Sequence, residues 1–251
     1  MEVMNAPLTE KHWHSMRLDL QDYMPAIRDN GLLMCCACGR FLTQDKFSLE
    51  HIIPKQALAD DPPEAKRLFT LAQRAGTILL CKAPLKINGK IYYENGCNSW
   101  KGRHYDKTIR EILNGRAISR AVKRIMPAHS IGLISLCYLA MVAHFGFQIA
   151  LTQSGKLLRQ QFFMPLRYHP SMPAVCQLTL IGGVPDFEET EPEYWSNPVS
   201  FDFEPGLCRA NFRNVVVNLP VSRDPKTPIV RHLPIKPSKF TLRPDFSTAF
   251  D

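Results

Sequence analysis

Residues 32–56 read LLMCCACGRFLTQDKFSLEHIIPKQ, and this stretch decides how the chain is expected to fold. Cys35 and Cys38 are separated by two residues and followed by Gly39, which is typical of a tight turn that points two thiolates at one metal ion. Glycine permits the backbone conformation that such a turn needs. The run 46–54, which carries an adjacent glutamate and histidine, is short and closed by proline. It therefore predicts a strand or one arm of a hairpin.

A second pair of cysteines completes a set of four. Cys81 follows the short apolar run GTILLC, which predicts a strand, and Cys97 comes after the insertion APLKINGKIYYENG. The Asn-Gly step inside this insertion predicts a hairpin that returns the chain to the metal. Four thiolates suit a closed, tetrahedral zinc site. The predicted ligands of this structural zinc ion are Cys35, Cys38, Cys81 and Cys97.

Two alternatives to this ligand set stay open. Cys36 is a spare thiol that could compete with Cys35, although the Cys-x-x-Cys-Gly spacing favours Cys35. Free cysteines also occur as small buried hydrophobic residues without any metal. Disulfides are the less favoured reading, because the N-terminus lacks the apolar core of a secretory signal.

Three motifs together resemble the zinc-stabilised form of the HNH endonuclease family: CxxCG, LEHIIPK at 49–55 and CNSWKG at 97–102. The resemblance covers roughly residues 32–107, under a third of the chain. It implies a ββα-metal unit, in which a hairpin and a helix surround one divalent cation that takes part in phosphodiester hydrolysis. Such hydrolysis needs a base for water and a cation at the phosphate.

The resemblance also assigns roles to individual residues. It implies that His51 is the general base, and that Glu50 and Asn98 offer oxygen ligands to catalytic Mg²⁺ or Mn²⁺. In a strand, Glu50 and His51 point to opposite faces. One can therefore act on the metal and the other on water only if the backbone bends there, a bend that Pro54 and the loop after it would help to form. Lys101 lies three residues after Asn98 on the same helical face and is expected to contact phosphate.

The chain departs from the family pattern at the middle asparagine, which usually orients the base histidine. Gly76 or Thr77 stands where that asparagine is expected. Another group, such as Asn95 or a backbone carbonyl, orients His51 instead, or the site is weakened. Asn98 also stands where many members have histidine, a change known in some branches.

Net charge points to a polyanionic partner. The chain carries +8 in total, and residues 82–124 alone hold 11 Lys/Arg against three acidic residues. Such a basic segment favours contacts with the phosphate backbone, which give affinity with little sequence information. The predicted nucleic-acid-binding residues are Lys101, Arg103, Arg116, Arg120, Lys123 and Arg124. DNA is the expected partner, RNA stays an alternative, and a protein partner or homodimer is a further one.

We expect an α+β protein with four segments: residues 1–30 helical, 31–126 the HNH domain with its zinc site, 127–164 apolar and helical, and 165–251 β-rich. The N-terminal helix is predicted over 8–29, with Thr9 as N-cap and a break at Pro25. A further basic helix is expected over 118–126. Within the C-terminal region, the runs 175–183, 199–204 and 211–220 predict strands.

The apolar run Ile131 to Gln153 is about long enough to span a membrane. His144, Gly146 and Gln148 interrupt it, so we expect a buried core helix and no membrane association. The chain is expected to be a cytoplasmic protein of bacterial or phage origin. Its alternative function, in a different class, is a catalytically inactive zinc module that binds nucleic acid or protein.

Overall fold

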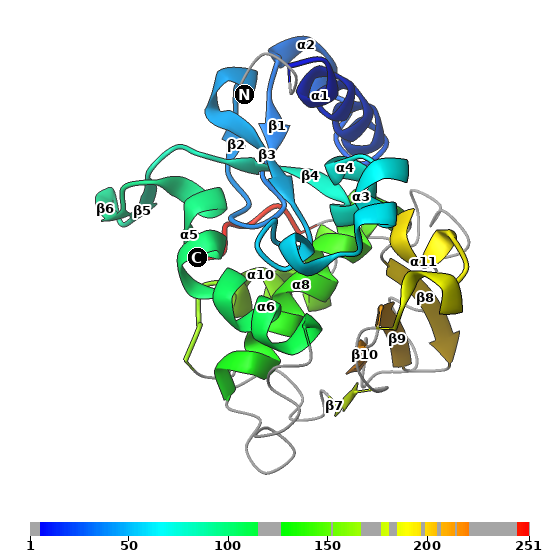
Figure 1. Cartoon of the computed structure of the whole chain (residues 1–251). Coiled ribbons are helices and arrows are strands. Elements are labelled where there is room, and N and C mark those ends of the chain that lie inside the picture. Colours follow the sequence, from blue (N-terminus) through cyan, green and yellow to red (C-terminus); the bar gives the residue numbers. More distant parts are fainter. Residues whose placement is uncertain are drawn as a thin grey trace.

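The computed structural model describes residues 6–114, 127–151, 153–166, 177–180, 185–196, 199–204, 207–213, 215–220 and 245–250. Helices and small antiparallel sheets are mixed along these ranges (Figure 1). The expected α+β class is therefore confirmed.

Two helices open the described chain. α1 (Ala6–Gln21) and α2 (Ile27–Asn30) are separated by a turn, so the predicted break at Pro25 is confirmed. Gly31 ends α2 with a φ of +63°, as its position after the helix predicts. Thr9 lies inside α1, which begins three residues earlier. Its predicted role as N-cap is therefore wrong.

The cysteine turn and the Glu-His run form two small antiparallel sheets. β1 (Leu33–Met34) pairs with β2 (Phe41–Leu42), and the turn between them contains Cys35 and Cys38. β3 (Phe47–His51) pairs with β4 (Thr77–Cys81), which confirms both predicted strands. The short helices before and between β3 and β4 are η1 (Gln44–Lys46), η2 (Leu58–Asp60), α3 (Pro63–Leu68) and α4 (Leu71–Ala75).

The insertion after β4 is the predicted hairpin. β5 (Leu85–Ile87) and β6 (Lys90–Tyr93) are joined by Asn88 and Gly89, whose φ angles of +50° and +77° suit a two-residue hairpin turn. Next come α5 (Gly96–His104) and α6 (Asp106–Leu113). The helix predicted from Asn98 past Tyr105 therefore begins earlier and is divided at Tyr105. The helix predicted over 118–126 lies outside the described residues.

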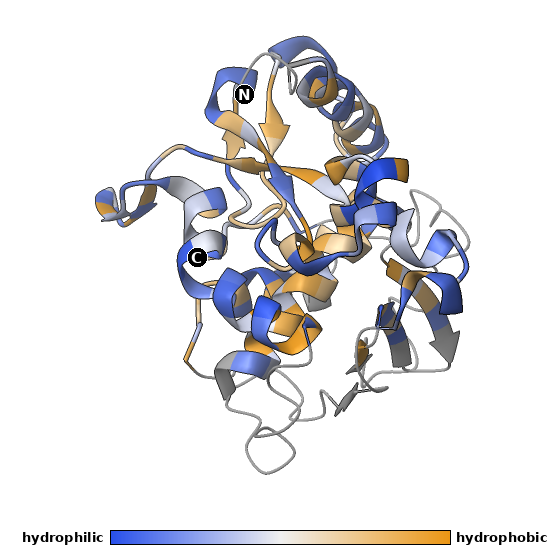
Figure 2. Cartoon of the chain, viewed as in Figure 1, coloured by the Kyte–Doolittle hydropathy of each residue, from blue (hydrophilic) through white to orange (hydrophobic). Residues whose placement is uncertain are grey.

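The apolar segment forms the centre of the core. α8 (Pro127–Phe145), α9 (Phe147–Ala150) and α10 (Gln153–Phe162) follow one another, and α8 is largely hydrophobic along its length (Figure 2). Gly146 divides the run predicted as one helix. The side chains of α8 between Ile131 and Met141 are buried, so the core-helix interpretation is confirmed. Within the described ranges, no helix has the length and apolar character needed to cross a membrane.

A four-stranded antiparallel sheet follows, in the order β7-β10-β9-β8. Its strands are β7 (Gln177–Leu180), β8 (Val199–Glu204), β9 (Leu207–Phe212) and β10 (Val215–Pro220), with η3 (Phe187–Glu189) and α11 (Glu193–Ser196) before β8. The run 211–220 was predicted as one strand, but it contains the end of β9, a turn and β10. The sheet is tied to the N-terminal half by Arg213, whose guanidinium binds both carboxylate oxygens of Asp61.

The end of the chain returns to the cysteine turn. Residues 245–250, red in Figure 1, lie between α5 and the helical core. The backbone N–H of Ala249 donates to the carbonyl of Cys38 at 3.0 Å. The buried guanidinium of Arg159 donates to the Ser247 carbonyl at 3.1 Å. The C-terminal segment therefore covers the cysteine turn, a contact that the sequence did not indicate.

Candidate functional site

The four predicted zinc ligands form one buried cluster. The Sγ atoms of Cys35, Cys38, Cys81 and Cys97 all lie within 4.8 Å of one another. Three of the sulfur–sulfur separations are 3.4, 3.7 and 3.9 Å. A tetrahedral ion with metal–sulfur bonds of about 2.3 Å would separate its ligands by about 3.8 Å. The cluster could therefore hold one metal ion, and Cys36, although buried, is not part of it.

Two glycines let the chain bring these sulfurs together. Gly39 has a φ of +80°, and a Cβ there would lie 2.6 Å from the carbonyl oxygen of Ser247 in the covering C-terminal segment. Gly96 has a φ of +73°, and a Cβ there would lie 2.7 Å from the Cys81 carbonyl oxygen. Only glycine fits at either position. The close approach at Gly96 allows Cys97 to return beside Cys81 after the hairpin.

Arg40 lines the cluster from outside and was not singled out in the sequence. Its guanidinium donates to the sulfurs of Cys38 and Cys81, at 3.5 and 3.3 Å. It also donates to the carbonyls of Ala83 and Pro84 at the start of the inserted hairpin. A tetrathiolate with a divalent ion carries a net charge of −2, so a fixed cation here offsets part of that charge. The basic residue directly after Cys-x-x-Cys-Gly was the available signal.

The helix α5 packs against the Ser48 and Glu50 side of β3. The amide Nδ2 of Asn98 donates to Ser48 Oγ at 2.9 Å and to the Leu49 carbonyl at 3.3 Å. The ammonium of Lys101 donates to Glu50 Oε1 at 2.7 Å. The residues predicted on the strand and on the helix therefore meet, although Asn98 contacts the residues just before Glu50 rather than its carboxylate.

Lys101 lies in a cluster of oxygen atoms. Besides Glu50, its ammonium donates to Asp106 Oδ1 at 2.8 Å and to the His51 carbonyl at 3.0 Å. Its side chain is only 1% exposed. This position speaks against the predicted phosphate contact, because the ammonium is already shared by three acceptors away from solvent. Asp106 is a further acidic residue of this site that the sequence analysis missed.

The charge states of Glu50 and Lys101 depend on their burial as well as on their ion pairing. Burial raises the pKa of the Glu50 carboxyl, and the Lys101 ammonium opposes that rise. Burial alone would lower the pKa of Lys101, but the carboxylates of Glu50 and Asp106 reverse the effect and raise it. Lys101 therefore stays protonated, as the cation of two carboxylates.

His51 is half-buried at the end of β3. Burial, with further contributions from Lys55 and Lys101, lowers the pKa of its imidazole to about 4. The ring is therefore neutral at pH 7, the form that can accept a proton. Among the described residues, no side chain hydrogen-bonds to this ring. The orienting role suggested for Asn95 or a backbone carbonyl stays a prediction.

Thr77, one of the two candidates for the position of the missing asparagine, lies directly opposite His51 in the β3–β4 register. Its hydroxyl is hydrogen-bonded to Nε2 of His12 at 2.8 Å.

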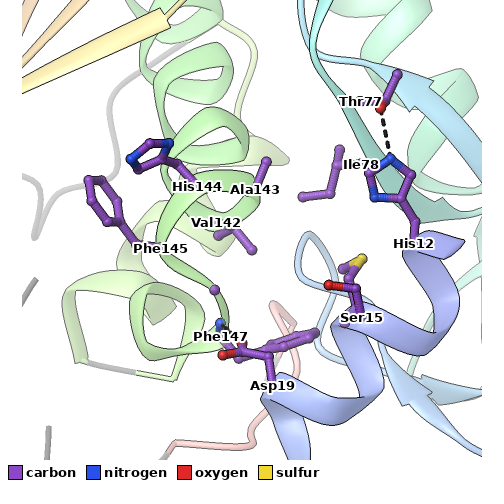
Figure 3. A pocket seen from close by; sticks show the side chains of 12 residues that line it. His12, Ser15, Asp19, Thr77, Ile78, Val142, Ala143, His144, Phe145 and Phe147 are labelled. Carbon is purple, nitrogen blue, oxygen red and sulfur yellow. Dashed lines mark hydrogen bonds between the residues drawn. The ribbon is translucent and has the colours of Figure 1, made fainter. Parts of the chain in front are cut away.

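The side chains of Thr77 and His12 line a cavity of about 260 Å³ between α1, β4 and the α8–α9 junction. Figure 3 shows His12 and His144 on its opposite walls, with Asp19 near the backbone of Phe147. The Asp19 carboxylate accepts a hydrogen bond from the Phe147 N–H at 2.5 Å, so this wall of the cavity is a contact between α1 and α9.

The predicted nucleic-acid-binding residues are only partly described. Arg103 is exposed on α5, whereas Lys101 is buried. The remaining four, Arg116, Arg120, Lys123 and Arg124, lie outside the described residues. A contribution of these residues to binding stays a prediction.

The site combines a buried set of four cysteine sulfurs, a neutral histidine beside a buried glutamate, and an amide on the adjoining helix. The chain matches no protein-family model, no curated protein and no solved structure.

Proposed function

We propose that this protein is a metal-dependent endonuclease of the HNH type that hydrolyses phosphodiester bonds in DNA. One observation carries the proposal: β3, β4 and α5 pack together beside the four-cysteine cluster, with Glu50, His51 and Asn98 all within this unit. The resemblance implies such a hairpin and helix around a catalytic cation, with the cysteine cluster as a separate, structural centre beside them.

The residues fit the chemistry of hydrolysis. His51 is neutral at pH 7, so its imidazole can take a proton from the attacking water. Glu50 and Asn98 carry oxygen atoms of the kind that bind Mg²⁺ or Mn²⁺. Such an ion, when bound, would offset the charge that develops at the scissile phosphate. Adjacent residues of a regular strand point to opposite faces, so His51 and Glu50 serve one scissile phosphate only if the backbone bends at His51, where β3 ends.

The cysteine cluster has a separate, structural role in this proposal. Four buried thiolates favour Zn²⁺ over the harder cations, and a closed set of ligands leaves no position for substrate. Zinc there would hold the ends of β4 and α5 together, since Cys81 and Cys97 belong to these elements. The orientation of Asn98 relative to β3 depends on that connection.

One observation favours the second candidate, a zinc module that binds nucleic acid or protein without cutting. The Lys101 ammonium already lies among Glu50, Asp106 and the His51 carbonyl. A catalytic cation at Glu50 would have to share this carboxylate with Lys101 or displace it. If the Lys101 ammonium stays in place, it supplies the hydrogen bonds and the positive charge for these oxygen atoms without any metal.

A plasmid-nicking assay with Mg²⁺ or Mn²⁺ distinguishes the two candidates. His51→Ala should reduce the cleavage rate by at least about 10²–10⁴-fold, the effect of removing a general base. His14→Ala, which removes an exposed histidine from α1, is the matched control and should cut like the wild type. Equal cleavage by His51→Ala and wild type would show that another residue is the base. DNA binding without cleavage under either metal would favour the second candidate.

A further inference from the structure

The hairpin of β5 and β6, residues 85–93, projects away from the body of the molecule (Figure 1). In β6, Lys90, Ile91 and Tyr92 are all exposed, and Lys86 on β5 is exposed as well. Ile91 keeps 57% and Tyr92 keeps 50% of its surface open to solvent. Both faces of this two-stranded ribbon are therefore accessible near its tip.

The base of the hairpin is fixed to the candidate site. Leu85 is buried, and the ring of Tyr93 meets that of Trp100 edge-on, with centroids 5.2 Å apart. Trp100 belongs to α5, the helix that also carries Asn98 and Lys101. Cysteine ligands flank the insertion on both sides. The Tyr92 ring also packs against Trp100, with centroids 5.6 Å apart, so the ribbon is held in a defined position relative to the site.

The exposed surface of the hairpin is basic and partly apolar. Between residues 82 and 95 the charged side chains are Lys82, Lys86 and Lys90 against Glu94, a net charge of +2. Figure 2 shows hydrophobic and hydrophilic positions together along the hairpin. A two-stranded ribbon gains little stability from side chains that it leaves in water. Exposed isoleucine and tyrosine beside lysines suit contact with a polyanion that also offers apolar surface.

We propose that this hairpin is a DNA-contacting finger. This inference rests on the proposed function for its choice of DNA as the polyanion, and it assigns a contact surface that the proposed hydrolysis does not require. Lys86 and Lys90 bind backbone phosphates, while Ile91 packs on sugars or base edges. Tyr92 adds its exposed half to this surface, since its ring also packs against Trp100 and Phe250. A two-stranded ribbon has the width that the major groove of duplex DNA admits. Its attachment to α5 brings the bound duplex towards Asn98.

Fluorescence anisotropy with a labelled DNA duplex tests the finger, in mild EDTA so that no substrate is consumed. The test variant is Lys86→Glu/Lys90→Glu. The matched control is Lys11→Glu/Arg28→Glu, which changes the net charge equally at exposed positions on α1 and α2. The test variant should bind at least about tenfold more weakly, and its salt slope should fall by about 2, as expected for two lost phosphate contacts. The control should change far less.

The apolar contact of the hairpin is tested by a second variant with its own matched control. Ile91→Ser should weaken binding without changing the salt slope, whereas Leu18→Ser, which alters an exposed leucine on α1, should not weaken it. Zinc content and circular dichroism verify that each variant is folded. Equal losses in test and control variants would overturn the proposal, as would wild-type protein that prefers RNA or binds no DNA.

If the wild type binds DNA through the hairpin but cuts nothing, the nuclease proposal fails and the DNA-contacting finger stands. If it cuts while the hairpin variants bind normally, the finger fails alone.

Discussion

Replacing Lys101 by methionine should destabilise the protein more than any comparable change of a surface lysine. The side chains of Lys101, Glu50 and Asp106 are 1%, 11% and 19% exposed. Removing the ammonium leaves two largely buried carboxylates without their cation. Breaking a buried pair in this way costs about 3–5 kcal/mol of the free energy of unfolding. Lys107→Met, at an exposed position on the next helix, should change it by less than about 0.5 kcal/mol.

The sign of the pH dependence follows from the charges. In Lys101→Met, ionised Glu50 and Asp106 repel each other, so the loss of stability is largest at neutral pH. Burial raises the pKa of Glu50 even in the wild type, and loss of Lys101 raises it further. The loss of stability caused by Lys101→Met should therefore shrink as the pH falls and Glu50 takes up a proton. Adding Glu50→Gln to the variant should likewise restore part of the lost stability.

Urea unfolding at constant zinc concentration, followed by tryptophan fluorescence, measures both effects. The comparison needs wild type, Lys101→Met, Lys107→Met and the Lys101→Met/Glu50→Gln double variant, at about pH 7 and about pH 5. If Lys101→Met is as stable as Lys107→Met at neutral pH, the buried cluster does not hold α5 on β3.

Three further predictions concern the metal centre and the base. Gly31→Ala should lower the free energy of unfolding by about 1–2 kcal/mol, because the φ of Gly31 is positive. No further loss is expected, since nothing lies within 4 Å of the added Cβ. Gly39→Ala should cost clearly more, since its Cβ would also meet the Ser247 carbonyl; equal costs in urea unfolding would mean that the C-terminal segment does not cover the turn. Arg40→Met should release zinc to a chromophoric chelator about tenfold faster, with Arg40→Lys intermediate, and unchanged release would remove Arg40 from the centre. Because the pKa of His51 is about 4, cleavage should stay level as the pH falls towards 5 and decline only below that; a decline centred near pH 6.5 would show an unshifted histidine.

Local patterns in the sequence predicted the parts of the fold that depend on neighbouring residues. The Asn88-Gly89 step predicts its hairpin because few residues adopt two successive positive φ angles. The four cysteines could be identified as one set because the Cys-x-x-Cys-Gly turn supplies two of them and the hairpin at Asn88-Gly89 returns Cys97 to Cys81. The break at Pro25 follows from a residue that cannot continue a helix. Gly146, in contrast, divides a strongly apolar run whose composition alone favoured one continuous helix.

Contacts between distant segments could not be predicted in the same way. Lys101 had the spacing of a surface residue, and its partners depend on how α5 lies on β3, some fifty positions earlier in the chain. The role of Arg40 depends on Cys81, which is far away in sequence. The return of residues 245–250 to the cysteine turn leaves no periodic signal, because the contact uses backbone groups at Ala249 and Cys38.

The central claim is that one chain carries a tightly held structural zinc and a separate, exchangeable catalytic cation. The most direct test measures zinc content and plasmid cleavage in the same sample, before and after mild EDTA treatment. The proposal predicts about one zinc per chain throughout, loss of cleavage in EDTA, and recovery when Mg²⁺ or Mn²⁺ is added. Folded protein without zinc, or zinc-loaded protein that cuts no DNA with any divalent cation, would contradict it.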